Sequence, residues 1–223
     1  MNSTADSLGL SNDLGLPQAC GMPALTRDFG VLDRHAFLAS YFLPSPSADP
    51  RYQQFRHVLI FRGMKASRNY AIARASILAQ IAEQERWKTD TSGGQGLPIL
   101  EFAPAFDDCM SDLYVVGRTI RRMGGLQLAD ASLLAFRSEH ESVIETLTIM
   151  RSKSDHMDEE IERQRLGGGP SMPFVSKDGT LALLGPYEVR LSDVARLIDG
   201  LFEALASTFK GVDFSIARLR EAR

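Results

Sequence analysis

Two side chains with complementary chemistry stand five positions apart in the second half of the chain, an arginine at 151 and a histidine at 156. The imidazole of a histidine titrates near neutral pH, so it can both accept and donate a proton under ordinary conditions. The guanidinium of an arginine carries a permanent charge in a planar fork that fits the oxygens of a phosphate group. Arg151 and His156 are therefore candidates for acid–base chemistry at a phosphate.

The segment over residues 150–158 resembles the R-x₄₋₆-H motif of the HEPN superfamily of helical-bundle proteins. Many members of that family are metal-independent ribonucleases of toxin–antitoxin and antiviral systems. They generally dimerise so that two motifs line one cleft. The resemblance implies that Arg151 binds the scissile phosphate of RNA and that His156 transfers protons. It also implies a homodimer, no cofactor, and an antitoxin or another protein as a partner. The auxiliary residues would be Ser152, Lys153 and Asp155.

The spacing of the motif leaves other interpretations open. A five-residue step on a straight helix separates two side chains by roughly 140°. Arg151 and His156 therefore meet only through the long arginine stem, a break in the helix or a second subunit. In the structural alternative, Arg151 pairs with Asp155, four residues on, and has no chemical role. Arg51 and His57 also match the motif, which shows how easily so short a pattern arises by chance.

A basic segment earlier in the chain supplies candidate contacts to RNA. Between residues 51 and 88, lysines and arginines outnumber acidic residues, and an exposed basic helix face can follow a phosphate backbone. The acidic residues between 139 and 162 are an alternative partner for the same cations. The residues expected to contact RNA are Arg62, Lys65 and Arg68.

The composition is that of an ordinary globular protein. With 223 residues, of which 44% are hydrophobic and 24% charged, the chain is long enough for a substantial core. A net charge of −3 argues against a polycation that binds nucleic acid over its whole surface. Cys20 and Cys109 are too few for a disulfide framework. Because neither a signal peptide nor an apolar run of about 20 residues is visible, we expect a cytoplasmic protein without membrane contact.

Hydrophobic periodicity predicts a mainly α-helical fold, a bundle of about four long helices. The longest pattern predicts a helix over 50–88, with apolar residues at alternating steps of three and four. The turn signal Lys177-Asp178-Gly179, with β-compatible residues on both sides, predicts a small β-hairpin insertion near residues 174–191. Further helices are expected over about 33–43, 104–123, 130–165 and 192–211.

The first 30 residues mix Ser, Asn, Asp, Gly and Pro with isolated leucines and show no hydrophobic period. We expect residues 1–30 to form a mobile, disordered arm. Residues 31–223 should then form one helical domain that carries the hairpin insertion.

Three functional hypotheses remain at this point. No cluster of His, Cys, Asp and Glu has metal-ligand spacing, and His140, on an apolar stripe, is interpreted as a hydrogen-bonded core or interface residue. The leading hypothesis is a HEPN-like, metal-independent endoribonuclease. The second is a non-catalytic helical protein-interaction protein, such as an immunity or adaptor subunit. The third is a nucleic-acid-binding protein that uses the basic helix alone.

Overall fold

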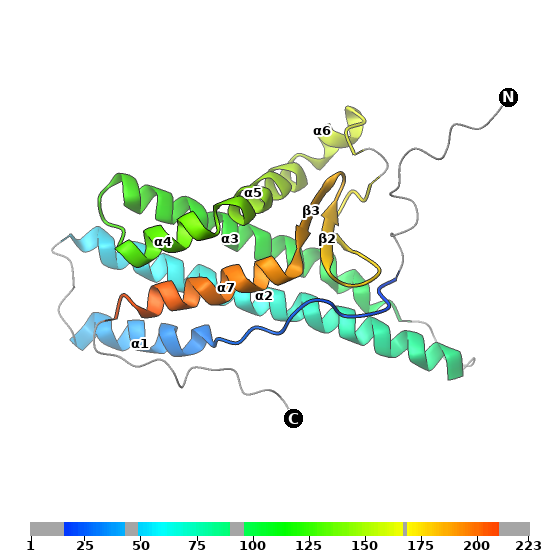
Figure 1. Ribbon diagram of the computed structural model, residues 1–223, viewed down its shortest axis with the longest axis horizontal. Helices are drawn as coiled ribbons and strands as arrows, with labels where there is room; N and C mark the ends of the chain where they lie inside the picture. Colours follow the sequence, from blue (N-terminus) through cyan, green and yellow to red (C-terminus); the bar gives the residue numbers. More distant parts are fainter. Residues whose placement is uncertain (1–15, 43–48, 90–95, 167–168, 210–223) are drawn as a thin grey trace.

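The chain folds mainly into helices and carries one small antiparallel sheet (Figure 1). A computed structural model describes residues 16–42, 49–89, 96–166 and 169–209. The helical fold class expected from the periodicity is confirmed. None of the helices in these ranges has an apolar stretch of the length and character needed to span a bilayer.

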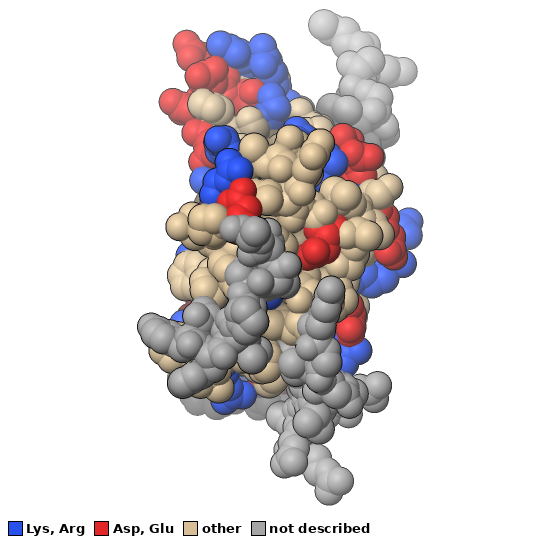
Figure 2. Space-filling model, turned by 90° about the vertical axis from the view of Figure 1, so that its left-hand side faces the viewer, with Lys and Arg blue, Asp and Glu red and all other residues tan. Residues whose placement is uncertain are grey.

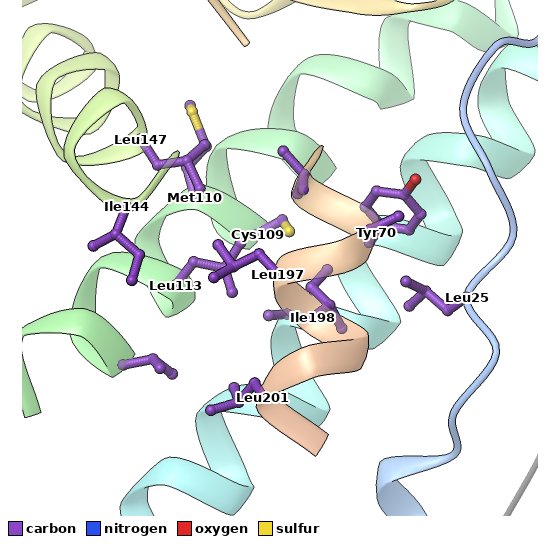
Figure 3. Packing of buried hydrophobic residues seen from close by; sticks show 14 of the residues in the cluster. Leu25, Tyr70, Cys109, Met110, Leu113, Ile144, Leu147, Leu197, Ile198 and Leu201 are labelled. Atoms are coloured by element: carbon purple, nitrogen blue, oxygen red, sulfur yellow. The ribbon is translucent and has the colours of Figure 1, made fainter. Parts of the chain in front are cut away.

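Helices α2 (Pro50–Thr89) and α3 (Phe102–Gly125) form the centre of the fold, with the short 3₁₀ helix η1 (Pro98–Glu101) leading into α3. α2 begins at Pro50, as the pattern predicts, because a proline at the first helical position loses no hydrogen bond. Tyr70 and Ile77 of α2 are fully buried, as are Phe106 and Met110 of α3. Figure 3 shows Tyr70 and Met110 within this core.

The chain between residues 131 and 162 is not the single helix that the periodicity predicts. It forms three helices, α4 (Ala131–Glu139), α5 (Glu141–Asp155) and α6 (Met157–Glu162). The interruptions fall at His140 and His156, whose ψ angles of 15° and 34° leave the helical range. α4 packs against α7 (Leu191–Ala206), whereas α5 packs against α3 and the sheet. The prediction of about four long helices is therefore not confirmed.

The insertion near residues 174–191 is a three-stranded antiparallel sheet, one strand more than the predicted hairpin. β1 (Phe174–Val175) pairs with β2 (Leu181–Leu184), which pairs with β3 (Tyr187–Arg190). In the β1–β2 turn, the Asp178 carboxylate accepts hydrogen bonds from the Thr180 N–H at 3.1 Å and the Ser176 hydroxyl at 2.5 Å. These bonds lower the pKa of Asp178, the Ser176 bond most strongly. A second turn at Gly185, with φ +55°, creates the unexpected third strand.

Part of the segment that was expected to be disordered is packed. Met22 and Leu25 are buried, and the Met22 carbonyl accepts a hydrogen bond of 3.0 Å from Nε of Arg74 in α2. Nε2 of Gln84 donates to the Pro17 carbonyl at 3.0 Å, so this stretch runs along α2 (Figure 1). The packed chain therefore starts before residue 31, the expected domain boundary. Residues 1–15 lie outside the described residues.

Two further helices cover α2. α1 (Phe29–Phe42) begins four residues before the predicted helix start, and α7 (Leu191–Ala206) begins one residue before it. The apolar side of α7, including Leu197, Ile198 and Leu201, is buried against the core (Figure 3). α7 ends at Ala206, and the predicted end at Gly211 lies outside the described residues.

The contact between α1 and α2 depends on the absence of a side chain at Gly63. A Cβ there would stand 2.3 Å from Cε1 of the buried Phe29 ring. We expect Gly63→Ala to lower the free energy of unfolding by about 1–3 kcal/mol, because the ring must shift. This loss should exceed the gain of ~1 kcal/mol that alanine brings in helix propensity. Urea unfolding measures the difference.

Gly125, the last residue of α3, is the matched control because a Cβ there meets no atom within 4 Å. Gly125→Ala should leave the stability unchanged or raise it slightly. Equal losses in the two variants would contradict the steric explanation.

Candidate functional site

The predicted proton-transfer residue lies at the break between α5 and α6. His156 has φ −116° and ψ 34°, and its side chain is 63% exposed. Its Nδ1 atom lies 3.8 Å from Oε1 of Glu159, one turn further on. The imidazole is therefore accessible to water and to a dissolved substrate.

Arg151 lies near the C-terminal end of α5, between two carboxylates. Its Nη1 atom lies 2.5 Å from Oδ1 of Asp155 and 3.8 Å from Oδ2 of Asp107 on α3. Asp107 also accepts a hydrogen bond of 2.6 Å from the Ser154 hydroxyl. The spacing indicated the Asp155 pair. No local pattern indicated Asp107, because it lies on a different helix.

The structure brings Arg151 and His156 to the same end of α5 without joining them. In the ranges that the structure describes, the charged partners of Arg151 are carboxylates and the charged neighbour of His156 is Glu159. This agrees with the wide angular separation of a five-residue helical step. A phosphate group or a second copy of the chain would have to bridge the two side chains.

Two of the three auxiliary residues, Lys153 and Asp155, take part in local ion pairing. Nζ of Lys153 donates a 2.9 Å hydrogen bond to Oε1 of Glu160, whose side chain is buried at the start of α6. This bond lowers the pKa of the Glu160 carboxyl. Lys153 therefore holds α6 against α5, and Ser152 is exposed beside it.

The surface around His156 carries both signs of charge. Asp155 and Asp158, which flank His156 in the sequence, are exposed, and Arg163 pairs with Glu159 at 3.2 Å. Figure 2 shows acidic and basic side chains crowded together at the top of the molecule, the height at which α6 lies in Figure 1. An approaching phosphate therefore meets carboxylates as well as cations.

The cations expected to contact RNA lie on α2, whereas His156 lies at the break between α5 and α6. Nη1 of Arg62 lies 2.7 Å from Oδ1 of Asp112, a side chain that is 2% exposed on α3, and Nζ of Lys65 lies 3.8 Å from the same oxygen. Two of the three cations thus neutralise a buried carboxylate. Arg68 is exposed, and no ion pair links it to another described residue.

The two residues of the second match to the motif, Arg51 and His57, have different surroundings. Arg51 forms a bidentate pair with Asp49 just before α2, with Nη2 to Oδ2 at 2.6 Å. His57 is exposed one and a half turns later. It lines a groove of about 630 Å³ between α1 and α2, together with Leu38 and Phe61.

His140 was interpreted as a hydrogen-bonded core or interface residue, and its half-buried position in a groove does not fit the core alternative. It ends α4, half-buried in a groove of about 790 Å³ between α4, α5 and α7, with its ring centroid 5.0 Å from that of Phe136. Burial lowers the pKa of its imidazole. In the described part of the chain no hydrogen bond to this ring is found. Its Nε2 atom is so close to α7 that a Cβ at Gly200 would stand 2.9 Å away.

The other reactive side chains offer little chemistry. Cys109 is fully buried on α3, and burial strongly raises the pKa of its thiol. In the described ranges no three His, Cys, Asp or Glu side chains are grouped so as to hold a metal ion.

Comparisons with protein-family models, with curated proteins and with solved structures find no match to this chain. The inference of function therefore rests on the geometry and on the residue types themselves.

The pairing of Arg62 with Asp112 predicts a structural role for this arginine. Arg62→Met keeps much of the stem and removes the charge, leaving the buried carboxylate with Lys65 at 3.8 Å. We expect the free energy of unfolding to fall by about 1–3 kcal/mol, the cost of an unsatisfied buried group. Chemical denaturation checks this value.

Arg118 is the control, because it is exposed on α3 and forms no ion pair with another described residue. Arg118→Met should change the stability by less than about 0.5 kcal/mol. If Arg62→Met is equally neutral, the pair with Asp112 does not stabilise the fold.

Proposed function

We propose that this chain is a HEPN-like, metal-independent endoribonuclease with His156 as its proton-transfer residue and Arg151 as its phosphate-binding residue. The observation that carries the proposal is the solvent-exposed imidazole at the α5–α6 break, five residues after an arginine whose guanidinium is held in place. A nuclease needs such a ring to be open to its substrate, and this one is.

The chemistry assigns one proton transfer to His156. The neutral imidazole accepts the proton of a ribose 2′-hydroxyl while the 2′-oxygen bonds to the adjacent phosphorus. The bond from phosphorus to the 5′-oxygen breaks, and an acid returns a proton to that oxygen, leaving a 2′,3′-cyclic phosphate. Water or the histidine of a second copy serves as that acid. Arg151 balances the charge that builds up on the non-bridging oxygens.

The carboxylates around Arg151 have opposite effects on such a reaction. Asp107 and Asp155 orient the guanidinium, so little side-chain entropy is lost when a phosphate binds. They also compete with the phosphate for the same positive charge. We therefore expect weak binding of RNA, with strong dependence on the salt concentration.

The proposal predicts that His156→Ala abolishes cleavage. Purified wild type should cut single-stranded RNA in EDTA, and the variant should be slower by about 10²- to 10⁴-fold, the usual contribution of a general acid or base. Gel analysis of the products, with circular dichroism to verify folding, measures the effect.

His57→Ala is the matched control, since His57 belongs to the other match to the motif and is also exposed. It should cleave like the wild type. Equal activity of wild type and His156→Ala, or no cleavage by wild type, would refute the ribonuclease proposal.

A second prediction concerns the competition for Arg151. Asp155→Asn removes the nearer carboxylate, so it should tighten the binding of a labelled RNA about two- to fivefold in fluorescence anisotropy. Asp158→Asn makes the same change in charge without touching the ion pairs of Arg151 in the described residues. It should have a smaller effect. If both variants change the affinity equally, only the net charge matters and Arg151 is not the phosphate site.

Protein binding without catalysis is the second candidate function. It is favoured by the ion pairs of Arg62, Lys65 and Lys153 within the chain, which reduce the positive field offered to RNA. A protein with this role leaves RNA intact both in EDTA and with magnesium. The same RNA assay therefore separates the two functions.

A further inference from the structure

α2 has a second apolar face, directed away from the core. Its buried face carries residues such as Leu59, Tyr70 and Ile77, yet Phe61 is 50% exposed, Val58 40% and Ile72 38%. Helices of monomeric proteins are commonly polar on the solvent side, and a helix that is apolar all round is usually covered. We therefore expect another protein surface to cover the exposed face of α2.

Val58, Phe61 and Ile72 follow the spacing of a coiled-coil seam, whereas Leu78, which is 42% exposed, lies beside it. The positions of the seam recur at alternating steps of three and four over more than three heptads, a distance of about 36 Å along the helix. Each of these positions is exposed. The seam consists of Val58, Phe61, Lys65, Arg68, Ile72, Ala75, Ala79 and Ala82.

Side-chain size varies along the seam in a way that fits a second copy. In an antiparallel pair of helices related by a two-fold axis, positions equidistant from the axis face each other. With the axis beside residue 70, near the middle of α2, large side chains in the first half of the seam face alanines in the second half. Close packing requires this alternation of large and small. Phe61 faces the partner's Ala79, Val58 the partner's Ala82, and Lys65 the partner's Ala75.

Charge selects the antiparallel orientation. In a parallel pair Lys65 and Arg68 would each face their own copies, and like charges at facing positions are destabilising. In the antiparallel pair Arg68 faces the partner's Ile72, along which its aliphatic stem can lie while the guanidinium reaches water. No seam position then faces a like charge.

The groove between α1 and α2 widens the surface at one end of the seam. It has a volume of about 630 Å³ and is lined by Leu38, His57 and Phe61 among others. In the antiparallel pair the end of the partner's α2 that carries alanines lies beside this groove. The small side chains at those positions let the helix approach closely.

We propose that α2 pairs with α2 of a second copy of this chain, antiparallel, about a two-fold axis beside residue 70. The contact involves neither Arg151 nor His156. The dimer and the ribonuclease activity can therefore fail independently of each other.

Cysteine cross-linking tests the orientation directly. Phe61→Cys and Ala79→Cys are made as separate proteins in a Cys20→Ser background, in which Cys109 stays buried. After the two proteins are mixed and treated with a short bis-thiol cross-linker, we expect a covalent dimer on a denaturing gel. Phe61→Cys alone should not link, because the antiparallel pair separates the two copies of residue 61 by about 27 Å along the axis.

The control is Arg118→Cys on α3, mixed with Ala79→Cys, which should give no dimer. Linking of Phe61→Cys with itself would indicate a parallel dimer and overturn the proposal. Absence of the mixed product, with both proteins folded by circular dichroism, would overturn it as well.

Introducing an acidic or a basic side chain at Ala75 tests the register without cysteines. Lys65 faces the partner's Ala75 twice in each dimer, so Ala75→Glu should lower the dissociation constant about fivefold and Ala75→Lys should raise it by a similar factor. Sedimentation equilibrium measures both, and the difference should shrink at high salt. Equal effects of the two substitutions, or a wild type that stays monomeric at all concentrations, would contradict the proposed contact.

Discussion

The packing of α2 against α3 is the contact on which the rest of the fold depends. Tyr70, fully buried in α2, places its hydroxyl 2.9 Å from the Pro23 carbonyl and 3.3 Å from the Leu191 carbonyl. One side chain thereby ties the packed N-terminal segment and the start of α7 to the central helix. Between α2 and α3, Arg62 neutralises the buried Asp112. Because an unpaired carboxylate there would be costly, this pair favours one relative position of the two helices.

The candidate site takes its position from α3. Ile144 and Leu147 of α5 lie beside Met110 and Leu113 of α3 in Figure 3, and Asp107 of α3 holds the last turn of α5 through Ser154 and Arg151. α5 ends at Asp155, the residue after Ser154, and the exposed His156 follows. The imidazole of His156 is thus open to solvent, whereas the guanidinium of Arg151 is held by Asp107 and Asp155. For this reason the two residues of the motif differ so much in accessibility.

The sequence predicted the elements that have local signals and missed those that depend on packing. Pro50 marks the start of α2, and Asp178 with Gly179 marks the β1–β2 turn, because proline, aspartate and glycine act through their own backbone. The breaks at His140 and His156 have no such signal, because the apolar period continues through both residues. At His140 the chain passes from α4, which packs on α7, to α5, which packs on α3, and at His156 it passes to α6, which contacts α5. The ion pair of Asp107 with Arg151 could not be predicted from a local pattern either, because it joins two separate helices.

The same distinction applies to the surfaces. Hydrophobic periodicity identifies a face of a helix without revealing whether neighbouring elements cover it. Val58 and Phe61 lie outside the stronger pattern of the buried face, so the periodicity did not indicate a second apolar face. The basic residues between 51 and 88 suggested a surface for RNA, yet Arg62 and Lys65 are engaged with Asp112. Within the described part of α2, the exposed seam is a row of apolar side chains that is interrupted by Arg68 and by Lys65, the residue already paired with Asp112. A surface of that composition favours a protein helix over a phosphate backbone, because phosphate and ribose groups offer no apolar partner to Val58 and Ile72.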